Sequence, residues 1–185
     1  SITNTAALTV ASGAALSLAN GTLTVDAVNI QNGATMTGSG TINNELVNDG
    51  TVTVTNGGTL TITGDVTNNG TMRLTAGSKI VNNGTFVNGG VLDLMTAGTA
   101  IPANFVNNGT FIDASAARLS SWSNSGTSFT LHIAGYSGHT YKLQVTTDLT
   151  AWTDIETRTG ATGQELVFTH DGGALTRLFY RIVVQ

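Results

Sequence analysis

The residues best suited to acid–base chemistry are the histidines and a short series of acids. His170 and Asp171 are adjacent, which is the composition of a general-base pair. General acid–base catalysis also needs a positioned substrate pocket and commonly a nucleophile, and no motif around this pair supplies either. The Gly-x-Ser-x-Gly signature is also absent. We therefore expect no catalytic residues and predict that the chain is not an enzyme.

Two pairs of acids stand at the same separation along the chain, Glu45 with Asp65 and Asp93 with Asp113. In a coil whose period matches that separation, each pair would be neighbours on successive turns. Two neighbouring carboxylates could catalyse glycoside hydrolysis as an acid–base pair, or they could provide some of the ligands of a calcium ion. A calcium site needs about six oxygen ligands, and the Gly-Gly-x-Gly-x-Asp repeat of calcium-binding solenoids is missing. We expect solvated acids, no metal and no cofactor; a polysaccharide-binding or polysaccharide-cleaving coil is the alternative.

A recurring motif must position these residues: an apolar residue, any residue, Asn, any residue and Gly. Its six copies begin at Leu46, Val66, Ile80, Phe86, Phe105 and Trp122. Corner glycines return at a near-constant interval in the series Gly13, Gly33, Gly50, Gly70, Gly90, Gly109 and Gly126. A period of about 19 residues lies near the shorter known solenoid periods.

Short segments between the corners alternate apolar and polar side chains, as in residues 22–25, 51–54 and 59–62. This alternation predicts strands with one face inward. Asn and Gly at the bends tolerate positive φ. An antiparallel meander of hairpins would use similar turns and is the competing topology. Because the motif returns at a near-constant period with the same inward pattern, we predict a parallel β-solenoid of about six turns over residues 1–127.

The Asn of the motif has a structural interpretation. Stacked turns bring equivalent positions to within about 4.8 Å of one another, so side-chain amides can hydrogen-bond along the stack and to the turning backbone. We predict a corner column of Asn48, Asn68, Asn88 and Asn107.

The composition changes after Thr127. Asparagine is frequent up to that point and absent from Ser128 to Gln185, whereas the shorter second part carries as many charged side chains as the first. Alternating segments at 129–133, 141–146, 153–157, 165–169 and 179–184 predict five short strands. We therefore predict a second domain over residues 128–185, a small C-terminal β-sandwich that caps the coil.

Two stretches of the sequence resemble known families. Gly58-Thr59-Leu60-Thr61-Ile62 resembles the solenoid stalk of secreted bacterial adhesins of the autotransporter type. The run from Gly138 to Gln144, with Thr147-Asp148-Leu149, Trp152 and Phe179-Tyr180-Arg181-Ile182, resembles a C-terminal β-sandwich module on large secreted proteins of environmental bacteria. These resemblances imply an extracellular or cell-surface location and a structural or adhesive role.

Overall composition excludes several partners. Only 10% of residues are charged, the net charge is -4 and the calculated pI is near 5.1. Nucleic acid is therefore not expected, because phosphate binding draws on clustered Lys and Arg. No apolar run reaches the roughly 18 residues that would cross a bilayer, so membrane insertion is not expected. The chain has no Cys, which excludes disulfides and thiolate metal sites.

The stretch from Ser1 to Val10 looks strand-like and contains no charge, no Pro and no capping helix. The end of a solenoid exposes unpaired backbone donors and acceptors. We expect this open turn to pair with the C-terminal region of another copy, with Ile2, Leu8 and Val10 at the polymer interface. Repeated head-to-tail contacts generate a filament, so copies of the chain are the expected partner and surface polysaccharide is a further candidate. The alternative is a monomeric stalk segment from a longer adhesin.

Overall fold

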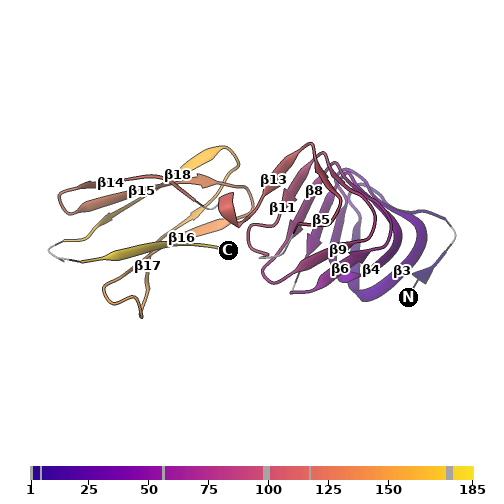
Figure 1. The fold of residues 1–185 in the computed structure, drawn as a ribbon, viewed down its shortest axis with the longest axis horizontal. Helices are drawn as coiled ribbons and strands as arrows, with labels where there is room; N and C mark the ends of the chain where they lie inside the picture. The colour runs from indigo at the N-terminus through magenta and orange to yellow at the C-terminus, as the bar shows by residue number, and fades with distance from the viewer. Residues whose placement is uncertain (1, 5, 56, 98–100, 117, 174–176) are drawn as a thin grey trace. The chain divides into compact units, whose positions relative to one another are not determined.

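The computed structural model describes residues 2–4, 6–55, 57–97, 101–116, 118–173 and 177–185. The chain is nearly all β and divides into two compact units, Ser1–Ala114 and Ser115–Gln185. The first unit is a parallel β-solenoid of about five turns, and the second carries two small antiparallel sheets (Figure 1). The expected fold class is confirmed, with about five turns in place of six.

The solenoid has three columns of parallel strands, one for each side of the coil. The first column contains β1 (Ile2–Thr3), parts of β3 (Ala15–Ile30) and β4 (Thr35–Asn48), β6 (Thr59–Ile62) and β9 (Lys79–Asn82). The second contains β2 (Leu8–Val10), parts of β3 and β4, β7 (Val66–Asn68), β10 (Phe86–Asn88) and β12 (Phe105–Asn107). The third contains parts of β3 and β4, β5 (Thr51–Val54), β8 (Thr71–Leu74), β11 (Val91–Asp93) and β13 (Thr110–Ile112). The pairing is parallel in all three, which excludes the antiparallel meander for this unit.

The core of the solenoid follows from the register of these columns. Leu46, Val66 and Phe86 lie over one another on successive turns and are fully buried. The next residue in the stack, Phe105, meets Phe86 edge to face with ring centroids 5.6 Å apart. Alternation along each strand therefore produces a continuous apolar interior, as the sequence pattern predicts.

The corner glycines are required because neighbouring turns approach closely. A Cβ placed on Gly70 would lie 2.1 Å from the carbonyl oxygen of Gly50, and one on Gly90 would lie 2.1 Å from the carbonyl oxygen of Gly70. Real Cβ atoms do not make such contacts, so a side chain here would force the turns apart.

The six copies of the motif do not occupy six equivalent turns. The copies at Leu46, Val66, Phe86 and Phe105 form the second column. The copy at Ile80 lies in β9, on a different side of the coil from the Phe86 copy that follows it.

The sixth copy, at Trp122, lies outside the solenoid. It forms β14 (Leu119–Ser125), which turns back through Gly126 at a φ of +62° and pairs antiparallel with β15 (Ser128–Gly135). An Asn-x-Gly sequence serves a hairpin as well as a coil corner, so the motif alone does not separate them. The structure consequently divides the chain after Ala114, earlier than the expected boundary between 127 and 128.

The C-terminal unit begins with the short 3₁₀ helix η1 (Ala114–Ala116) at its border and consists of two three-stranded sheets. One has the order β14-β15-β18 (Gln164–Asp171); the other has the order β17 (Thr153–Thr159), β16 (Thr140–Thr146), β19 (Phe179–Val184). Leu131 and Phe168 of the first sheet pack with Tyr141 and Leu143 of the second in one buried cluster. The five predicted strands are confirmed as β15 to β19, and β14 is an additional strand.

Candidate functional site

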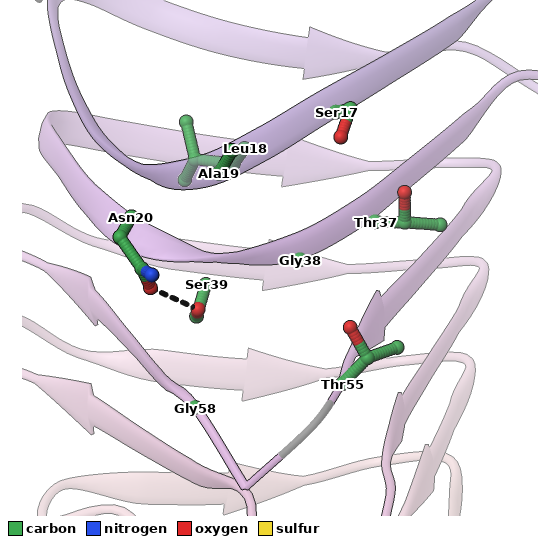
Figure 2. A pocket seen from close by; sticks show the side chains of 9 residues that line it. All are labelled: Ser17, Leu18, Ala19, Asn20, Thr37, Gly38, Ser39, Thr55 and Gly58. Carbon is green, nitrogen blue, oxygen red and sulfur yellow. Dashed lines mark hydrogen bonds between the residues drawn. The ribbon is translucent and has the colours of Figure 1, made fainter.

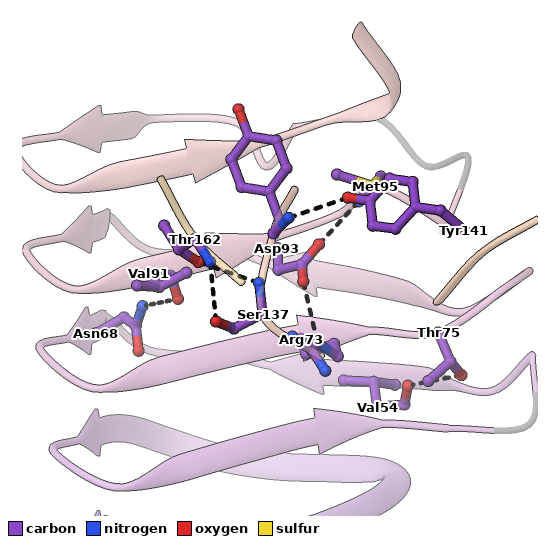
Figure 3. A network of polar contacts seen from close by, with 11 residues as sticks. Val54, Asn68, Arg73, Thr75, Val91, Asp93, Met95, Ser137, Tyr141 and Thr162 are labelled. Carbon is purple, nitrogen blue, oxygen red and sulfur yellow. Dashed lines mark hydrogen bonds and ion pairs between the residues drawn. The ribbon is translucent and has the colours of Figure 1, made fainter. Parts of the chain in front are cut away.

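The corner asparagines form a hydrogen-bonded ladder along the second column of the solenoid. The Nδ2 of each amide donates to the Oδ1 of the next at 2.7 Å, in the order Asn48, Asn68, Asn88, Asn107. The same three donors also reach carbonyl oxygens on the adjoining turn, at 3.0 Å for Thr71, 2.9 Å for Val91 and 3.1 Å for Thr110. Figure 3 shows the contact between Asn68 and Val91.

The burial of the ladder asparagines indicates a structural role and not a ligand-binding one. Asn48, Asn68 and Asn88 are fully buried, whereas Asn107 is exposed at the last step. A buried amide without partners is costly, so a column of amides is stable only when each member bonds its neighbours. The same column positions in earlier turns hold Val10 and Ile30, so the ladder begins at the third turn.

The first pair of candidate acids, Glu45 and Asp65, lies at adjacent exposed positions on successive turns. The Asp65 carboxylate accepts a 2.7 Å hydrogen bond from the backbone N–H of Thr85, so it supports the next corner. Among the described residues, no three His, Asp or Glu side chains gather as metal ligands would.

The second pair is not in register. Asp93 aligns with Ile112 on the following turn and with Arg73 on the preceding one. Its carboxylate is 1% exposed and receives the Arg73 Nε at 3.0 Å and the Met95 backbone N–H at 3.1 Å (Figure 3). Asp93 is therefore a buried, hydrogen-bonded ion-pair partner and is not the solvated acid that the sequence predicts.

A polar hollow of about 550 Å³ lies at a solenoid corner between the early turns (Figure 2). Its walls include Ser17, Asn20, Thr37, Ser39 and Thr55, and none of its lining residues is charged. The Ser39 hydroxyl donates to the Asn20 Oδ1 at 2.6 Å. The hollow offers hydrogen bonds from hydroxyl and amide groups, but its lining includes no carboxylate, imidazole or amine that would activate a serine or threonine hydroxyl as a nucleophile.

The histidines of the C-terminal unit do not form a general-base pair. His170 and Asp171 are consecutive in β18, so their side chains point to opposite faces of the sheet. His170 Nδ1 lies 3.0 Å from the Tyr180 hydroxyl, and the Asp171 carboxylate accepts the Gly173 N–H at 3.0 Å. Burial, followed by the negative charge of Asp171, raises the pKa of Tyr180.

A second polar cluster lies on the outer face of the sheet that contains β14. His132 Nδ1 is 3.0 Å from one Glu165 carboxylate oxygen, and the Ser120 hydroxyl donates to the other at 3.1 Å. The hydrogen bond from His132, followed by that from Ser120, lowers the pKa of Glu165. The serine and the histidine meet the carboxylate separately, so this surface cluster lacks the serine-to-base contact of a hydrolase.

The three residues expected at the polymer interface lie in the first turn of the solenoid. Ile2 pairs with the buried Leu23, so its side chain points along the inner column, yet it is 58% exposed. Leu8 is half-buried and Val10 is buried. In the described part of the chain, β1 and β2 each pair with β3 alone, so one edge of the first turn is open.

An apolar groove in the C-terminal unit was not anticipated from the sequence. It has a volume of about 220 Å³ and is lined mainly by Leu119, Trp122, Phe129, Leu131, Tyr180 and Ile182. We call it the Trp122 groove. Trp122 is 65% exposed and Leu119 is 51% exposed. In the sequence Trp122 is the apolar residue that begins the sixth copy of the motif, and only its place on the edge strand β14 reveals this surface.

Fold and site together define the class: an all-β protein in which a parallel β-solenoid is followed by a small antiparallel β-sandwich. Comparison of the chain with protein-family models, with curated proteins and with solved structures gave no match. The described residues include no helix with the length and apolar character needed to cross a bilayer.

Proposed function

We propose that the chain is an extracellular structural protein, a subunit of a filament or surface fibre built by head-to-tail contacts between copies. The single observation that supports this function is the one-sided pairing of β1 and β2 in the described residues. Strand edges with free donors and acceptors recruit further strands, and a contact between unlike surfaces repeats without limit unless it closes a ring.

The chemistry of the first turn favours strand addition. The first charged side chain of the sequence is Asp26, so no side-chain charge on β1 or β2 opposes a neighbouring strand. The exposed Ile2 offers an apolar side chain that a further turn would bury. Backbone hydrogen bonds would give the joint affinity, and the inner apolar column would fix its register.

The edge can be blocked at one backbone atom. The carbonyl of Val10 accepts a bond from the Gln31 N–H on the second turn at 3.0 Å. Because successive residues of a strand direct their backbone groups to alternate sides, the N–H of Thr9 points away from that turn. Proline is tolerated at such an edge position but removes the donor. Thr9→Pro should therefore abolish assembly, whereas Thr9→Val, which keeps the N–H, should preserve it.

Electron microscopy and sedimentation velocity of the purified chain, over a range of concentrations, provide the readout. The proposal expects fibres that lengthen with concentration for the natural sequence and for Thr9→Val, and monomers for Thr9→Pro. Circular dichroism spectra that agree among the three proteins establish that the solenoid is folded. A natural chain that stays monomeric and forms no fibres at high concentration contradicts the proposal.

A stalk segment of a longer adhesin is the second candidate, favoured by the regular stacking of the coil. Each column continues in parallel register from turn to turn, which suits a spacer between a cell surface and a distal module. In that case the open edge of β1 and β2 would be covered by a preceding turn of the same polypeptide. A native mass spectrum of the intact secreted protein separates the two candidates, since the stalk requires a polypeptide much heavier than 18.9 kDa.

A further inference from the structure

The two sheets of the C-terminal unit do not cover one another completely. Phe129 of β15 stacks on Tyr180 of β19 with ring centroids 4.4 Å apart, so β19 lies over β15. The first sheet continues beyond β15 to β14, but the second sheet ends at β19. Among the described strands of the sandwich, none therefore covers the inner face of β14.

The side chains at this position belong to the core face. Trp122 pairs across the strands with Leu131, and Leu119 pairs with Ile133, and paired residues point to the same side of a sheet. Leu131 and Ile133 are 3% and 0% exposed, whereas Trp122 and Leu119 are 65% and 51% exposed. The inner face of β14 is thus apolar core surface that lacks a covering layer in the described part of the unit.

A free strand edge borders the same groove. Within the described residues, β19 pairs only with β16, so its other edge presents unpaired backbone donors and acceptors beside Tyr180 and Ile182. A fourth strand added to β19 would satisfy these groups and would also lie over Trp122. The free edge of β19 and the Trp122 groove together suit the binding of an extended segment whose apolar side chains alternate along the strand.

We propose that β19 and the Trp122 groove are the acceptor for the first turn of a second copy of this chain. The inference rests on the proposed head-to-tail function and names the surface that receives the open edge. The joint places two free strand edges side by side, and Ile2 or Leu8 of the donor covers Trp122 and Leu119.

The distribution of charge on the two surfaces is compatible with the first turn of a second copy as the occupant of the groove. Residues 1–25 carry no charged side chain, so the donor strands bring no ionised side chain that would lose its hydration in an apolar groove. Arg181, the one charged residue lining the groove, is already engaged: its Nε donates to the Gln144 Oε1 at 2.7 Å, and its guanidinium lies 4.1 Å from the centroid of the Trp152 ring. A stable joint buries at least about 1,000 Å² in total, so contact must extend along the whole strand edge and beyond the groove.

Cysteine cross-linking tests this arrangement directly, because the natural chain contains no Cys. Full chains carrying Ile2→Cys and, in a second mixture, full chains carrying Leu8→Cys are combined with full chains carrying Trp122→Cys under assembly conditions and treated with a short thiol-specific cross-linker. Leu119→Cys replaces Trp122→Cys if the latter fails to fold. Thr169→Cys, exposed on the outer face of the same sheet, is the matched control.

The proposal expects mixed dimers of Ile2→Cys or Leu8→Cys with Trp122→Cys or Leu119→Cys, several-fold more abundant than those with Thr169→Cys. Cross-linked homodimers of the Trp122→Cys chain would overturn it in favour of a symmetric contact between two β19 edges. Fibres in which neither groove position cross-links to Ile2→Cys or to Leu8→Cys would also overturn it, while leaving the proposed function intact. If the unmodified chain forms no fibres, the proposed function itself fails.

Discussion

The solenoid and the C-terminal unit satisfy their polar groups in different ways. Residues 1–114 carry eight charged side chains, and the shorter segment 115–185 carries ten. Along its second column the solenoid uses neutral amides that bond to equivalent amides on the neighbouring turn, and it also contains the partly buried Arg73–Asp93 ion pair. The C-terminal unit uses ion pairs such as Lys142–Asp154, at 3.3 Å, and aromatic contacts between its two sheets. A repeated position can be filled by an amide because Asn both donates and accepts, whereas stacked like charges would repel.

The largest effect should come from adding a methyl group where two turns touch. Gly70→Ala places a Cβ 2.1 Å from the Gly50 carbonyl oxygen, so we expect a loss of about 3 kcal/mol in unfolding free energy. Gly21→Ala is the matched control, because its Cβ would have no atom within 4 Å, and it should gain about 0.5 kcal/mol. Chemical denaturation followed by far-UV circular dichroism measures both. Equal effects of the two substitutions would show that turn spacing does not limit the solenoid.

The next effect concerns the amide ladder. Asn68→Ala removes a buried amide bonded to Asn48 and Asn88, leaving the Asn88 Oδ1 without its donor, and should cost about 2 kcal/mol. Asn69→Ala, one residue away and exposed, removes only a surface bond to Asp49 and should change stability by less than about 0.5 kcal/mol. The same denaturation experiment compares them. If both variants are as stable as the natural chain, the ladder contributes nothing measurable.

The smallest effect is a pH dependence confined to the C-terminal unit. Hydrogen bonds from Thr150, followed by those from the Thr146 hydroxyl and the Ala151 N–H, hold the pKa of Asp148 well below its usual range. Because the folded-state pKa is depressed, this stabilisation is complete above the ordinary Asp value of 3.8 and is lost as the pH falls through the folded-state pKa. Asp148→Ala should therefore lower stability at neutral pH, with a difference that disappears in strong acid.

Tryptophan fluorescence isolates this effect, since Trp122 and Trp152 both lie in the C-terminal unit. Urea unfolding at pH 7 and at low pH compares Asp148→Ala with the natural chain, and Asp26→Ala in the solenoid serves as control. A destabilisation that is the same at both pH values would mean that the charge of Asp148 is not its source.

The solenoid could be predicted from the sequence more completely than the C-terminal unit. The period of the corner glycines and the alternation of apolar residues identify the parallel coil, because stacking makes each local signal recur. The series from Asn48 to Asn107 could be recognised for that reason. Trp122 begins a copy of the same motif but lies in a hairpin, where it pairs with Leu131 of the next strand. The motif does not specify that partner strand, so the hairpin could not be predicted from it.

Features of the candidate site that depend on one particular contact were beyond sequence reasoning. The burial of Asp93 follows from the position of Arg73 on the preceding turn, whereas its separation from Asp113 along the chain suggests a different neighbour. The Trp122 groove arises because the two three-stranded sheets are offset, so that β14 lies beyond β19, the edge strand of the facing sheet. No local sequence pattern encodes this offset.

Backbone amide exchange at Thr9, measured by NMR as a function of protein concentration, tests the central claim most directly. We predict that this amide exchanges rapidly in dilute solution, because it lies on the open edge of β2. It should become protected as concentration rises and another copy accepts its hydrogen bond, whereas the amide of Thr67, inside the column, stays protected throughout. Rapid exchange at Thr9 at every concentration, or protection already complete in the dilute monomer, would contradict assembly through this edge.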